Sequence, residues 1–370
     1  MRNFFKALMA VLCVVLVPCD AWGQLHRKSL ISEKQAEAVD VAMTAEMTKQ
    51  RAVGLALGII RDGKIAYIRG YGFEDRESQV HVTSKTMFRW ASISKTLTAV
   101  AAMQLVEQNR LNLDANVRQY VDEFPIKDAV ITARQLLCHQ GGIVHYFNGK
   151  VVQTQREYSV PHPFENVIVA LDRFKDSPLI AQPGEGYSYT THGYILLSAV
   201  VQRAGEQRYA DQIRERIAKP LGMTTLQPDY QWKEIPHRAV GYRLRNGEVV
   251  RSTDTDVSWK LGGGGFVSNI DDLARWATAL INGRVVSTTS EKQMWKRQQT
   301  ASGTDTKMGL GFFVEMQGET LKVSHSGSQE KTRTRLVIYP RLKHGMVVMT
   351  NSENAKPTAF ATLAYQALRN

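Results

Sequence analysis

The chain has 370 residues, of which 43% are hydrophobic and 22% are charged. These proportions are ordinary for a globular protein and exclude a disordered chain, a collagen-like repeat and a small disulfide scaffold. The 47 Lys and Arg residues exceed the 35 Asp and Glu residues, which gives a formal net charge of +12. The basic residues are dispersed and no zinc-finger or RNA-binding motif accompanies them, so we expect a solvated basic surface rather than a nucleic-acid site.

The N-terminal residues have the pattern of an export signal. Two early cations precede an unbroken apolar run over residues 7–17, and the small residues Ala21 and Gly23 follow it. A membrane-spanning helix needs ~20 apolar residues, so this run is too short to be one. We therefore predict a signal peptide over residues 1–23 and a secreted or periplasmic mature chain. Its remaining charge of +11 suits an anionic envelope surface.

The three cysteines lie at positions 13, 19 and 138. Cys13 and Cys19 fall within the predicted signal peptide, so the mature chain would keep only Cys138 and has no internal disulfide. A lipoprotein anchor at Cys19 is disfavoured, because Pro18 stands where such anchors require a small residue. Cys138 ends an apolar stretch that predicts a buried helix end, so it is a poor candidate nucleophile.

In chain order, the periodicity first predicts a helix over residues 33–50. An antiparallel hairpin follows over residues 53–71, around the Asp62-Gly63 turn, with large residues on one strand face and small ones on the other. From Leu97 to Val106 nearly every residue is apolar, which predicts a helix buried on all sides. Helix and loop patterns then continue to residue 223. Later, strands are predicted at 311–315, 320–324, 333–339 and 345–350, and a closing helix at 355–368.

Strand patterns at both ends and helices between them predict an α+β fold: an antiparallel sheet flanked by N- and C-terminal helices, with an inserted helical lobe. We expect one catalytic domain over residues 24–370. Its sheet lobe would comprise residues of about 33–85 and 235–370, and its helical lobe residues of about 86–234. The cleft between the lobes is the expected place for chemistry, with the proline-rich stretch 148–185 as a loop over its mouth.

Ser92 and Lys95 stand at the entry of the buried helix. Residues three apart on a helix share a face, so the lysine can reach the serine hydroxyl. A lysine partly desolvated near other cations has a lowered pKa and can accept the hydroxyl proton. The buried helix that follows distinguishes this pair from those that occur by chance.

Two later stretches carry further candidate groups. Tyr189, in Tyr189-Thr190-Thr191, is a candidate proton shuttle, although on spacing alone it is more simply a residue that packs at a helix start. His325-Ser326-Gly327 is predicted at the end of a strand, where N–H groups can pair with an extended substrate and complete an oxyanion hole with the N–H of Ser92. His325 would donate to a substrate carboxylate; the alternative is a structural strand-end histidine.

These three elements, in this order, resemble the serine β-lactamase and penicillin-binding-protein superfamily. The closer resemblance is to the class C β-lactamase-related serine hydrolases, and among them to the mitochondrial serine β-lactamase-like proteins. It extends over about residues 33–368. Further matching stretches are Asp62-Gly63-Lys64, Arg89 to Lys95, Leu136 to Tyr146, Pro183-Gly184 and Lys260 to Ser268.

The resemblance implies a role for each matching residue. Ser92 would be the acylated nucleophile, Lys95 its base partner and Tyr189 the proton shuttle. His325-Ser326-Gly327 takes the place of a Lys-Thr-Gly element, and the N–H groups of Ser92 and Ser328 would form the oxyanion hole. Thr191 stands where the family usually has Asn. Because Thr offers only a short hydroxyl, efficient β-lactam turnover is not expected.

The sequence predicts neither a metal nor another cofactor. The glycine run 262–265 lacks the Gly-Lys-Ser/Thr of a phosphate loop, and residues 268–271 instead have the pattern of a helix cap. The nine histidines form no His-Glu-x-x-His and no compact set of ligands. Of these, His139 and His145 flank a Gly-Gly bend and are predicted either to support residues of the site without contacting substrate or to be structural.

We therefore predict a serine acyl hydrolase that forms an acyl-enzyme on a small-molecule or peptide substrate. Peptidase action, such as D-Ala-D-Ala carboxypeptidase action on cell-wall peptide, ranks ahead of esterase and β-lactamase action. The alternative from another class is a weakly active penicillin-binding or assembly protein, suggested by Thr191 and by Gln329-Glu330-Lys331, whose charges would crowd the substrate strand. A nucleic-acid binder built on the positive charge ranks last.

Overall fold

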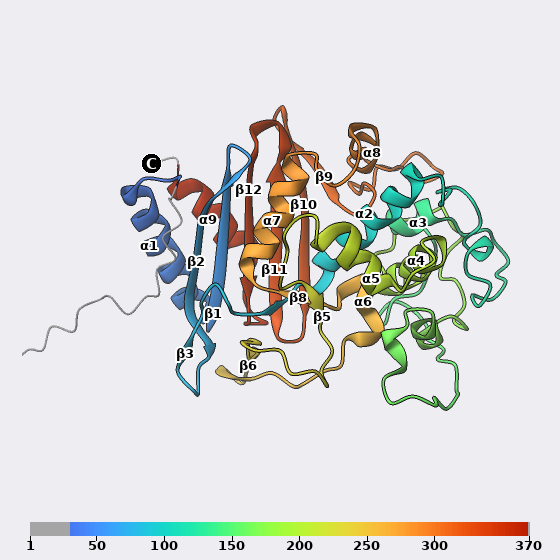
Figure 1. Cartoon of the computed structure of the whole chain (residues 1–370), viewed down its shortest axis with the longest axis horizontal. Helices are drawn as coiled ribbons and strands as arrows, with labels where there is room; N and C mark the ends of the chain where they lie inside the picture. Colours follow the sequence, from blue (N-terminus) through green and yellow to red (C-terminus); the bar gives the residue numbers. More distant parts are fainter. Residues whose placement is uncertain (1–29, 369–370) are drawn as a thin grey trace, which may run out of the picture.

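The computed structural model describes residues 30–368, in which seven antiparallel strands form one sheet in the order β3-β2-β1-β12-β11-β10-β9. This sheet makes up one lobe, and helices and loops make up the other (Figure 1). The strands are β1 (Gly54–Arg61), β2 (Lys64–Asp75), β3 (Val80–His81), β9 (Phe313–Gln317), β10 (Thr320–Gln329), β11 (Thr332–Tyr339) and β12 (His344–Thr350). The predicted α+β class is confirmed.

The hairpin and the pairing of β1 with β12 join the two ends of the chain. Asp62 and Gly63 both have positive φ, 51° and 69°, as the tight turn between β1 and β2 requires. Leu55 of β1 is the register partner of Thr350 of β12, so the first and last strands lie side by side in the middle of the sheet. The predicted co-folding of the two ends into one sheet is therefore confirmed.

Helices cover both faces of the sheet. On one face, α1 (Glu33–Gln50) and α9 (Pro357–Ala367) bury the large side chains of β1, such as Leu55 and Leu57. On the other face lies α7 (Ile270–Ile281), which comes close because β1 carries small residues there. A Cβ on Gly58 would stand 3.3 Å from the Cβ of Ala274. The division of β1 into a large face and a small face thus has the predicted effect.

The helical lobe is built around α2 (Ser94–Glu107), in which every residue from Ser94 to Met103 is buried. The other helices of this part of the molecule are α3 (Ala133–Leu137), α4 (Thr191–Ala204), α5 (Tyr209–Ile213), α6 (Leu261–Gly264) and α8 (Thr288–Met294). Both α4 and α6 pack against α2, so they bring residues from three distant stretches to its N-terminal end. The predicted boundaries of the two lobes remain a prediction.

Three expectations about local structure need correction. His325-Ser326-Gly327 lies inside β10 rather than at a strand end, because β11 pairs with β10 as far as Gln329. The cap of α7 is Asn269 alone, whose side chain accepts the N–H of Asp272, so the helix begins at Ile270, inside the stretch 268–271 that was predicted to cap it. Five short strands were not predicted. Two of them lie in the stretch expected to form the helical lobe, β4 (Phe88–Arg89) and β5 (Gln227–Pro228), and three lie in the stretch expected to form the sheet lobe, β6 (Tyr242–Arg245), β7 (Glu248–Arg251) and β8 (Phe266–Ser268).

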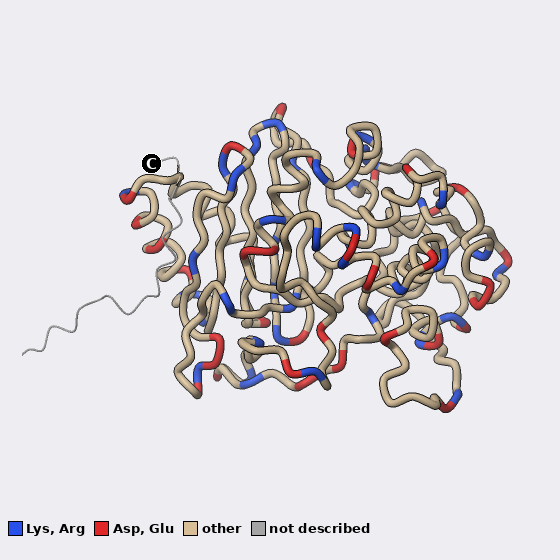
Figure 2. Tube along the Cα trace, viewed as in Figure 1, with Lys and Arg blue, Asp and Glu red and all other residues tan. Residues whose placement is uncertain are grey.

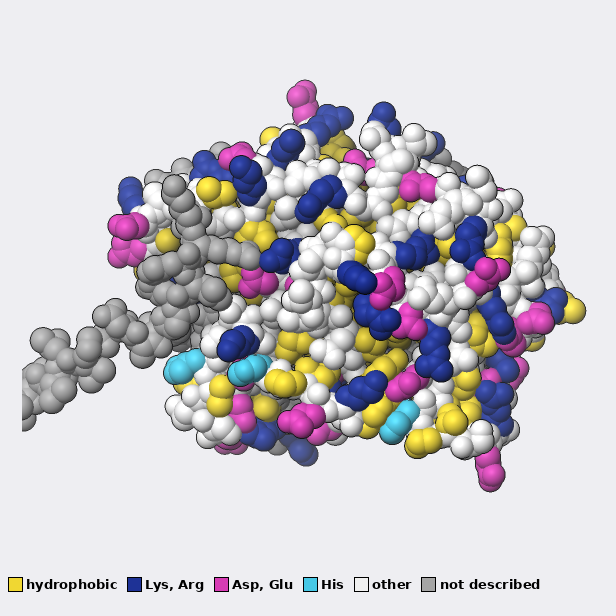
Figure 3. All heavy atoms as spheres, in the orientation of Figure 1, with side chains coloured by type: hydrophobic (Ala, Val, Ile, Leu, Met, Phe, Trp, Pro, Cys, Tyr) yellow, Lys and Arg dark blue, Asp and Glu magenta, His cyan; other side chains and the backbone are white. Residues whose placement is uncertain are grey.

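The hydrophobicity of the described helices and the charges on one face of the molecule can be compared with the sequence predictions. No helix within residues 30–368 is both long enough and apolar enough to cross a membrane. Lys and Arg alternate with Asp and Glu along the chain, and on the face drawn in Figure 3 the two kinds of charge are mixed (Figures 2 and 3). The predicted signal peptide, with Cys13 and Cys19, lies outside the described residues.

Candidate active site

The candidate nucleophile, Ser92, lies in a 3-10 turn, Ala91–Ile93, that leads directly into α2. Hydrogen bonds fix the residue before this turn: the Trp90 N–H donates to Phe266 O (2.8 Å), and the Thr334 hydroxyl donates to Trp90 O (2.9 Å). Ala91 itself has φ of 48°, a left-handed conformation that costs a non-glycine residue ~1–3 kcal/mol. The strand contacts hold the strained turn that presents the serine.

The ammonium group of Lys95 lies at the centre of a buried hydrogen-bond network. Its Nζ is 3.2 Å from Ser92 Oγ, 3.2 Å from Thr191 Oγ1 and 2.7 Å from the Gly263 carbonyl oxygen. The side chain is fully buried, and burial lowers its pKa well below the usual value, with the charge of Lys260 acting in the same direction. A neutral amine has two N–H donors and one lone pair. A neutral amine that donates its two hydrogens to Gly263 and Thr191 directs its lone pair at the Ser92 hydroxyl.

Tyr189 lies beside this network, with Lys95 Nζ 4.9 Å from the centre of its ring. Burial raises the pKa of its phenol, and a hydrogen bond with Ser92 opposes that rise. The phenol is therefore protonated near neutral pH and is in contact with the serine. The structure brings three of the predicted residues together around Ser92: Lys95, Tyr189 and Thr191.

His139 holds the backbone on both sides of Tyr189. Its carbonyl accepts the Ser188 N–H (2.9 Å), and its Nδ1 accepts the Thr190 N–H (3.1 Å). The imidazole ring packs on the phenol ring with centroids 4.2 Å apart, and burial keeps the imidazole pKa well below 6.5. The structure thus gives His139 the first of its two predicted roles, support of the site, and identifies Tyr189 as the residue supported, which the sequence did not indicate.

The third motif forms one wall of the site from β10. His325 is buried, and its Nδ1 lies 2.8 Å from the Ser326 carbonyl; since a carbonyl only accepts, Nδ1 carries the proton. Burial lowers the imidazole pKa to about 3, so Nε2 is unprotonated and has no partner among residues 30–368. The expected donation to a substrate carboxylate would require a proton on Nε2. The free ring offers an acceptor instead.

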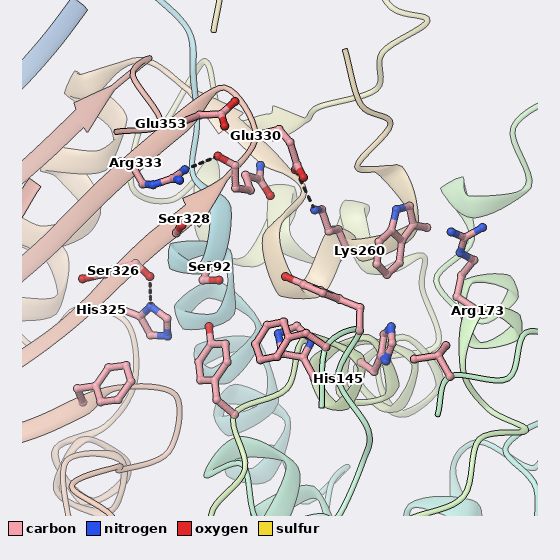
Figure 4. A pocket seen from close by; sticks show the side chains of 18 of the residues that line it. Ser92, His145, Arg173, Lys260, His325, Ser326, Ser328, Glu330, Arg333 and Glu353 are labelled. Carbon is pink, nitrogen blue, oxygen red and sulfur yellow. Dashed lines mark hydrogen bonds and ion pairs between the residues drawn. The ribbon is translucent and has the colours of Figure 1, made fainter. Parts of the chain in front are cut away.

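Gly327 allows β10 to approach the turn that carries Ser92. A Cβ at this position would lie 2.5 Å from Trp90 O and 2.9 Å from the Cβ of Ala91. This approach sets Ser328 beside Ser92, and both line the same cleft (Figure 4). Beyond Ser324 no strand pairs with the outer edge of β10 in the described chain, so this edge is open to an extended substrate.

A cleft of about 810 Å³ contains Ser92, Tyr189, His325, Ser326 and Ser328. Its other walls come from the loop predicted over the mouth, from the aromatic residues around His145, and from the segment before α6; members of these walls are Val151, Gln153, Tyr146, Phe147, Trp259 and Lys260. Within residues 30–368, no group of three His, Cys, Asp or Glu side chains is arranged to hold a metal ion.

Cys138 takes no part in the cleft. It is buried at the C-terminal end of α3, as predicted, and burial raises the pKa of its thiol to about 12. A thiol with such a pKa is almost entirely protonated near neutral pH and is a weak nucleophile.

Comparison with known proteins identifies the family of this site. The family model described as beta-lactamase matches residues 39–370, which include the whole cleft. The chain belongs to the β-lactamase family. Its nucleophile, lysine and tyrosine thus stand in the fold of β-lactamases and penicillin-binding proteins, and the family predicted from the motifs is confirmed.

Three relatives illustrate the similarity. The mitochondrial serine β-lactamase-like protein LACTB of Homo sapiens is 30% identical over 295 residues, which cover 63% of this chain and 54% of that protein. The octameric penicillin-binding protein homologue from Pyrococcus abyssi has a TM-score of 0.75 at 25% identity, covering 90% of this chain and 77% of that one. A D-amino acid amidase from Ochrobactrum anthropi has a TM-score of 0.75 at 19% identity, covering 91% and 99%. The chain thus spans about half the length of the mitochondrial relative.

Proposed function

We propose that the chain is a serine acyl hydrolase that works through an acyl-enzyme on Ser92. The observation that carries this proposal is the 3.2 Å contact between Ser92 Oγ and the buried, pKa-depressed amine of Lys95. A serine hydroxyl is a weak nucleophile until a neighbouring base takes its proton. In this cleft the neutral amine of Lys95 is that base.

The first half-reaction follows from the geometry. Ser92 Oγ attacks the carbonyl carbon while its proton passes to Lys95 Nζ, and the carbonyl oxygen becomes an oxyanion. The N–H groups of Ser92 and Ser328 are the donors proposed to stabilise that charge; each such donor contributes about 10²-fold to 10³-fold in rate. The bond to the leaving group then breaks, and Tyr189 donates its phenolic proton to the departing nitrogen or oxygen while Lys95 reprotonates the phenolate.

The second half-reaction hydrolyses the acyl-enzyme. A water molecule gives one proton to the neutral amine of Lys95 and attacks the ester carbonyl carbon. The bond between that carbon and Ser92 Oγ then breaks, Lys95 returns the proton to Ser92 Oγ, and the carboxylic acid product leaves. Thr191 contributes to both halves by accepting a hydrogen bond from Lys95 (3.2 Å), which keeps the lone pair aimed at Ser92. The Thr191 hydroxyl keeps its own hydrogen to donate, but it lacks the separate donor and acceptor groups of the side-chain amide that the family usually has here.

The proposed substrates are amides of small peptides, including D-amino-acid peptides of the cell wall, followed by esters and β-lactams. Two features support this order. The open edge of β10 past Ser324 suits main-chain pairing with a peptide. The fold is also that of a D-amino acid amidase, although at 19% identity this likeness extends to the fold alone. The export pattern of residues 1–23 further supports the proposal that the enzyme acts in the periplasm or outside the cell.

A substrate panel tests the proposal. D-Ala-D-Ala peptides, p-nitrophenyl esters and nitrocefin would be compared in the wild-type chain and in the Ser92→Ala variant. The proposal expects hydrolysis of at least one amide or ester and its loss in the variant, with an unchanged melting temperature as the control for folding. Equal turnover in Ser92→Ala would refute it.

A second candidate, a penicillin-binding or assembly protein that acylates without turnover, is favoured by one observation. Glu330 lines the cleft and pairs with Lys260 at 3.9 Å, so a charged side chain stands where substrate would enter. This candidate predicts covalent labelling of Ser92 by a penicillin-type probe with no release of product over hours. Release of product within minutes would exclude it.

A further inference from the structure

Lys260 is a buried cation in the cleft that the reaction outlined above does not use. Its side chain is 11% exposed and lines the cleft, just before the short helix α6. Within residues 30–368 one carboxylate lies within 4.0 Å of its ammonium, Glu330 Oε2 at 3.9 Å, and that side chain is 47% exposed; Asp256 acts on the charge from farther away. No hydrogen bond to the ammonium accompanies this loose pair in the described chain. Burial lowers the pKa of Lys260 as a result.

A second cation lies on the same wall. The guanidinium carbon of Arg173 is 5.2 Å from the ring centre of Trp259, and Lys260 Nζ is 5.5 Å from it. Nε of Arg173 is buried without a hydrogen-bond partner in the described residues. Both cations line the cleft together with the indole. Two positively charged side chains thus lie near the ring of Trp259, and in the described residues neither forms a close ion pair with a carboxylate.

The other charges of the cleft are already satisfied. Arg333 donates to the carbonyls of Gln329 and Thr332, both at 2.7 Å, and Glu353 accepts the N–H of Lys331 at 3.0 Å. Keeping a charge away from water without a close partner costs several kcal/mol. A ligand with negative charge would remove that cost, and a carboxylate matches the donor geometry of a guanidinium and an ammonium.

The position of this wall relative to Ser92 indicates which part of a substrate would reach it. Figure 4 shows Lys260 and Arg173 on the side of the pocket away from His325 and Ser326. The leaving group must meet Tyr189, whose ring lies 6.4 Å from that of His325, so it occupies the side of β10. The opposite wall is left for the acyl portion.

We propose that Lys260 and Arg173, which both lie near the ring of Trp259, form an anion subsite. The preferred substrates then carry a carboxylate in their acyl portion. This inference rests on the proposed hydrolase function and narrows its substrate class. Glu330 pairs with the Lys260 ammonium when no substrate is bound, and the substrate carboxylate displaces the Glu330 side chain toward solvent. Release of Lys260 from this weak pair is a small cost, because the partner is half exposed.

A matched pair of esters tests the subsite. Mono-4-nitrophenyl adipate and its methyl ester have the same acyl chain and leaving group and differ in one negative charge. The corresponding suberate pair has a longer acyl chain, which places the carboxylate farther from the ester carbonyl. The measured quantity is the ratio of kcat/KM for the acid to kcat/KM for the methyl ester. We expect a ratio of roughly 10 to 100 in the wild-type chain, the range for a charge-assisted hydrogen bond. The ratio should fall to about 1 in Lys260→Met and stay high in Lys260→Arg.

The ratio separates this role from an effect of Lys260 on the base. Lys260 also helps to lower the pKa of Lys95, so Lys260→Met changes activity on every substrate, but such a change cancels in the ratio. Glu330→Gln removes the competing carboxylate and should raise the ratio above the wild-type value. The exposed Lys292→Met serves as the matched control and should leave the ratio unchanged.

The outcomes distinguish the subsite from the hydrolase function itself. Turnover of both esters with a ratio near 1, or a ratio that Lys260→Met leaves high, overturns the subsite and leaves the hydrolase intact. Absence of turnover and of any Ser92 acyl adduct with either ester overturns both. A melting temperature of Lys260→Met close to that of the wild type shows that a fallen ratio comes from the subsite rather than from misfolding.

Discussion

Substitution of Gly327 by alanine should move apart the two N–H groups proposed to form the oxyanion hole, those of Ser92 and Ser328. The new Cβ would stand 2.5 Å from the Trp90 carbonyl oxygen and 2.1 Å from Thr334 Oγ1. Thr334 can rotate, but the carbonyl belongs to the backbone that leads into the Ser92 turn. An ordinary contact needs ~3.4 Å, so β10 and the turn must move apart by ~0.9 Å. A misplacement of about 1 Å costs roughly 10²-fold in rate.

The assay is kcat/KM on the best substrate of the panel, together with labelling of Ser92 by a fluorophosphonate probe. We expect kcat to fall about 10²-fold, because the displaced Ser328 N–H acts on the transition state and not on the bound substrate. Gly186→Ala is the matched control, since a Cβ there meets nothing within 4 Å. A Gly327→Ala variant with wild-type kcat would refute the assignment of Ser328 to the oxyanion hole.

Three further predictions follow from the buried charges. Lys95→Met should lower kcat/KM by roughly 10²-fold to 10⁴-fold without lowering the melting temperature; retained activity would remove Lys95 as the base. Burial lowers the His325 pKa to about 3, so the unfolded chain binds the extra proton between that value and ~6.5. Stability, measured by urea unfolding, should therefore fall as pH falls through this window, and less steeply in His325→Asn; equal slopes would contradict it. Asp229, whose side chain is 0% exposed, pairs with Arg89, and in Arg89→Met its remaining ionic partner in the described chain is Arg238 at 3.1 Å. The free energy of unfolding, measured with urea, should therefore fall by about 3 kcal/mol. A fall below ~1 kcal/mol would show that Arg238 alone compensates the buried carboxylate.

The parts of the fold that depend on local patterns were predictable from the sequence. The helix at residues 33–50 was predicted with the bounds it has in the structure, and the Asp62-Gly63 turn requires the positive φ values that glycine and aspartate tolerate. The β6–β7 hairpin was missed although Asn246-Gly247 has the same turn signal, with φ of 51° and 79°. Its strands are only four residues long, and although Tyr242–Arg245 alternates apolar and charged side chains, Glu248–Arg251 does not.

The candidate site was predictable where chemistry depends on side-chain type and spacing, as for Ser92 and Lys95. It was not predictable where the contributing group belongs to the backbone or acts through another residue. The Gly263 carbonyl that orients Lys95 and the two His139 atoms that hold the Tyr189 segment appear only when distant stretches meet. The continuation of β10 through His325 also depends on its partner strand β11, and Gly and Ser in that stretch have low strand propensity.

The central claim is that Ser92, activated by Lys95, carries the acyl group during turnover. The most direct measurement is rapid acid quench of the wild-type chain during hydrolysis of a p-nitrophenyl ester, followed by peptide mass spectrometry. The account predicts one acyl adduct, on the peptide that contains Ser92, which appears before steady-state product and is absent from Ser92→Ala. Hydrolysis with no adduct, or with an adduct on another residue that persists in Ser92→Ala, would contradict it.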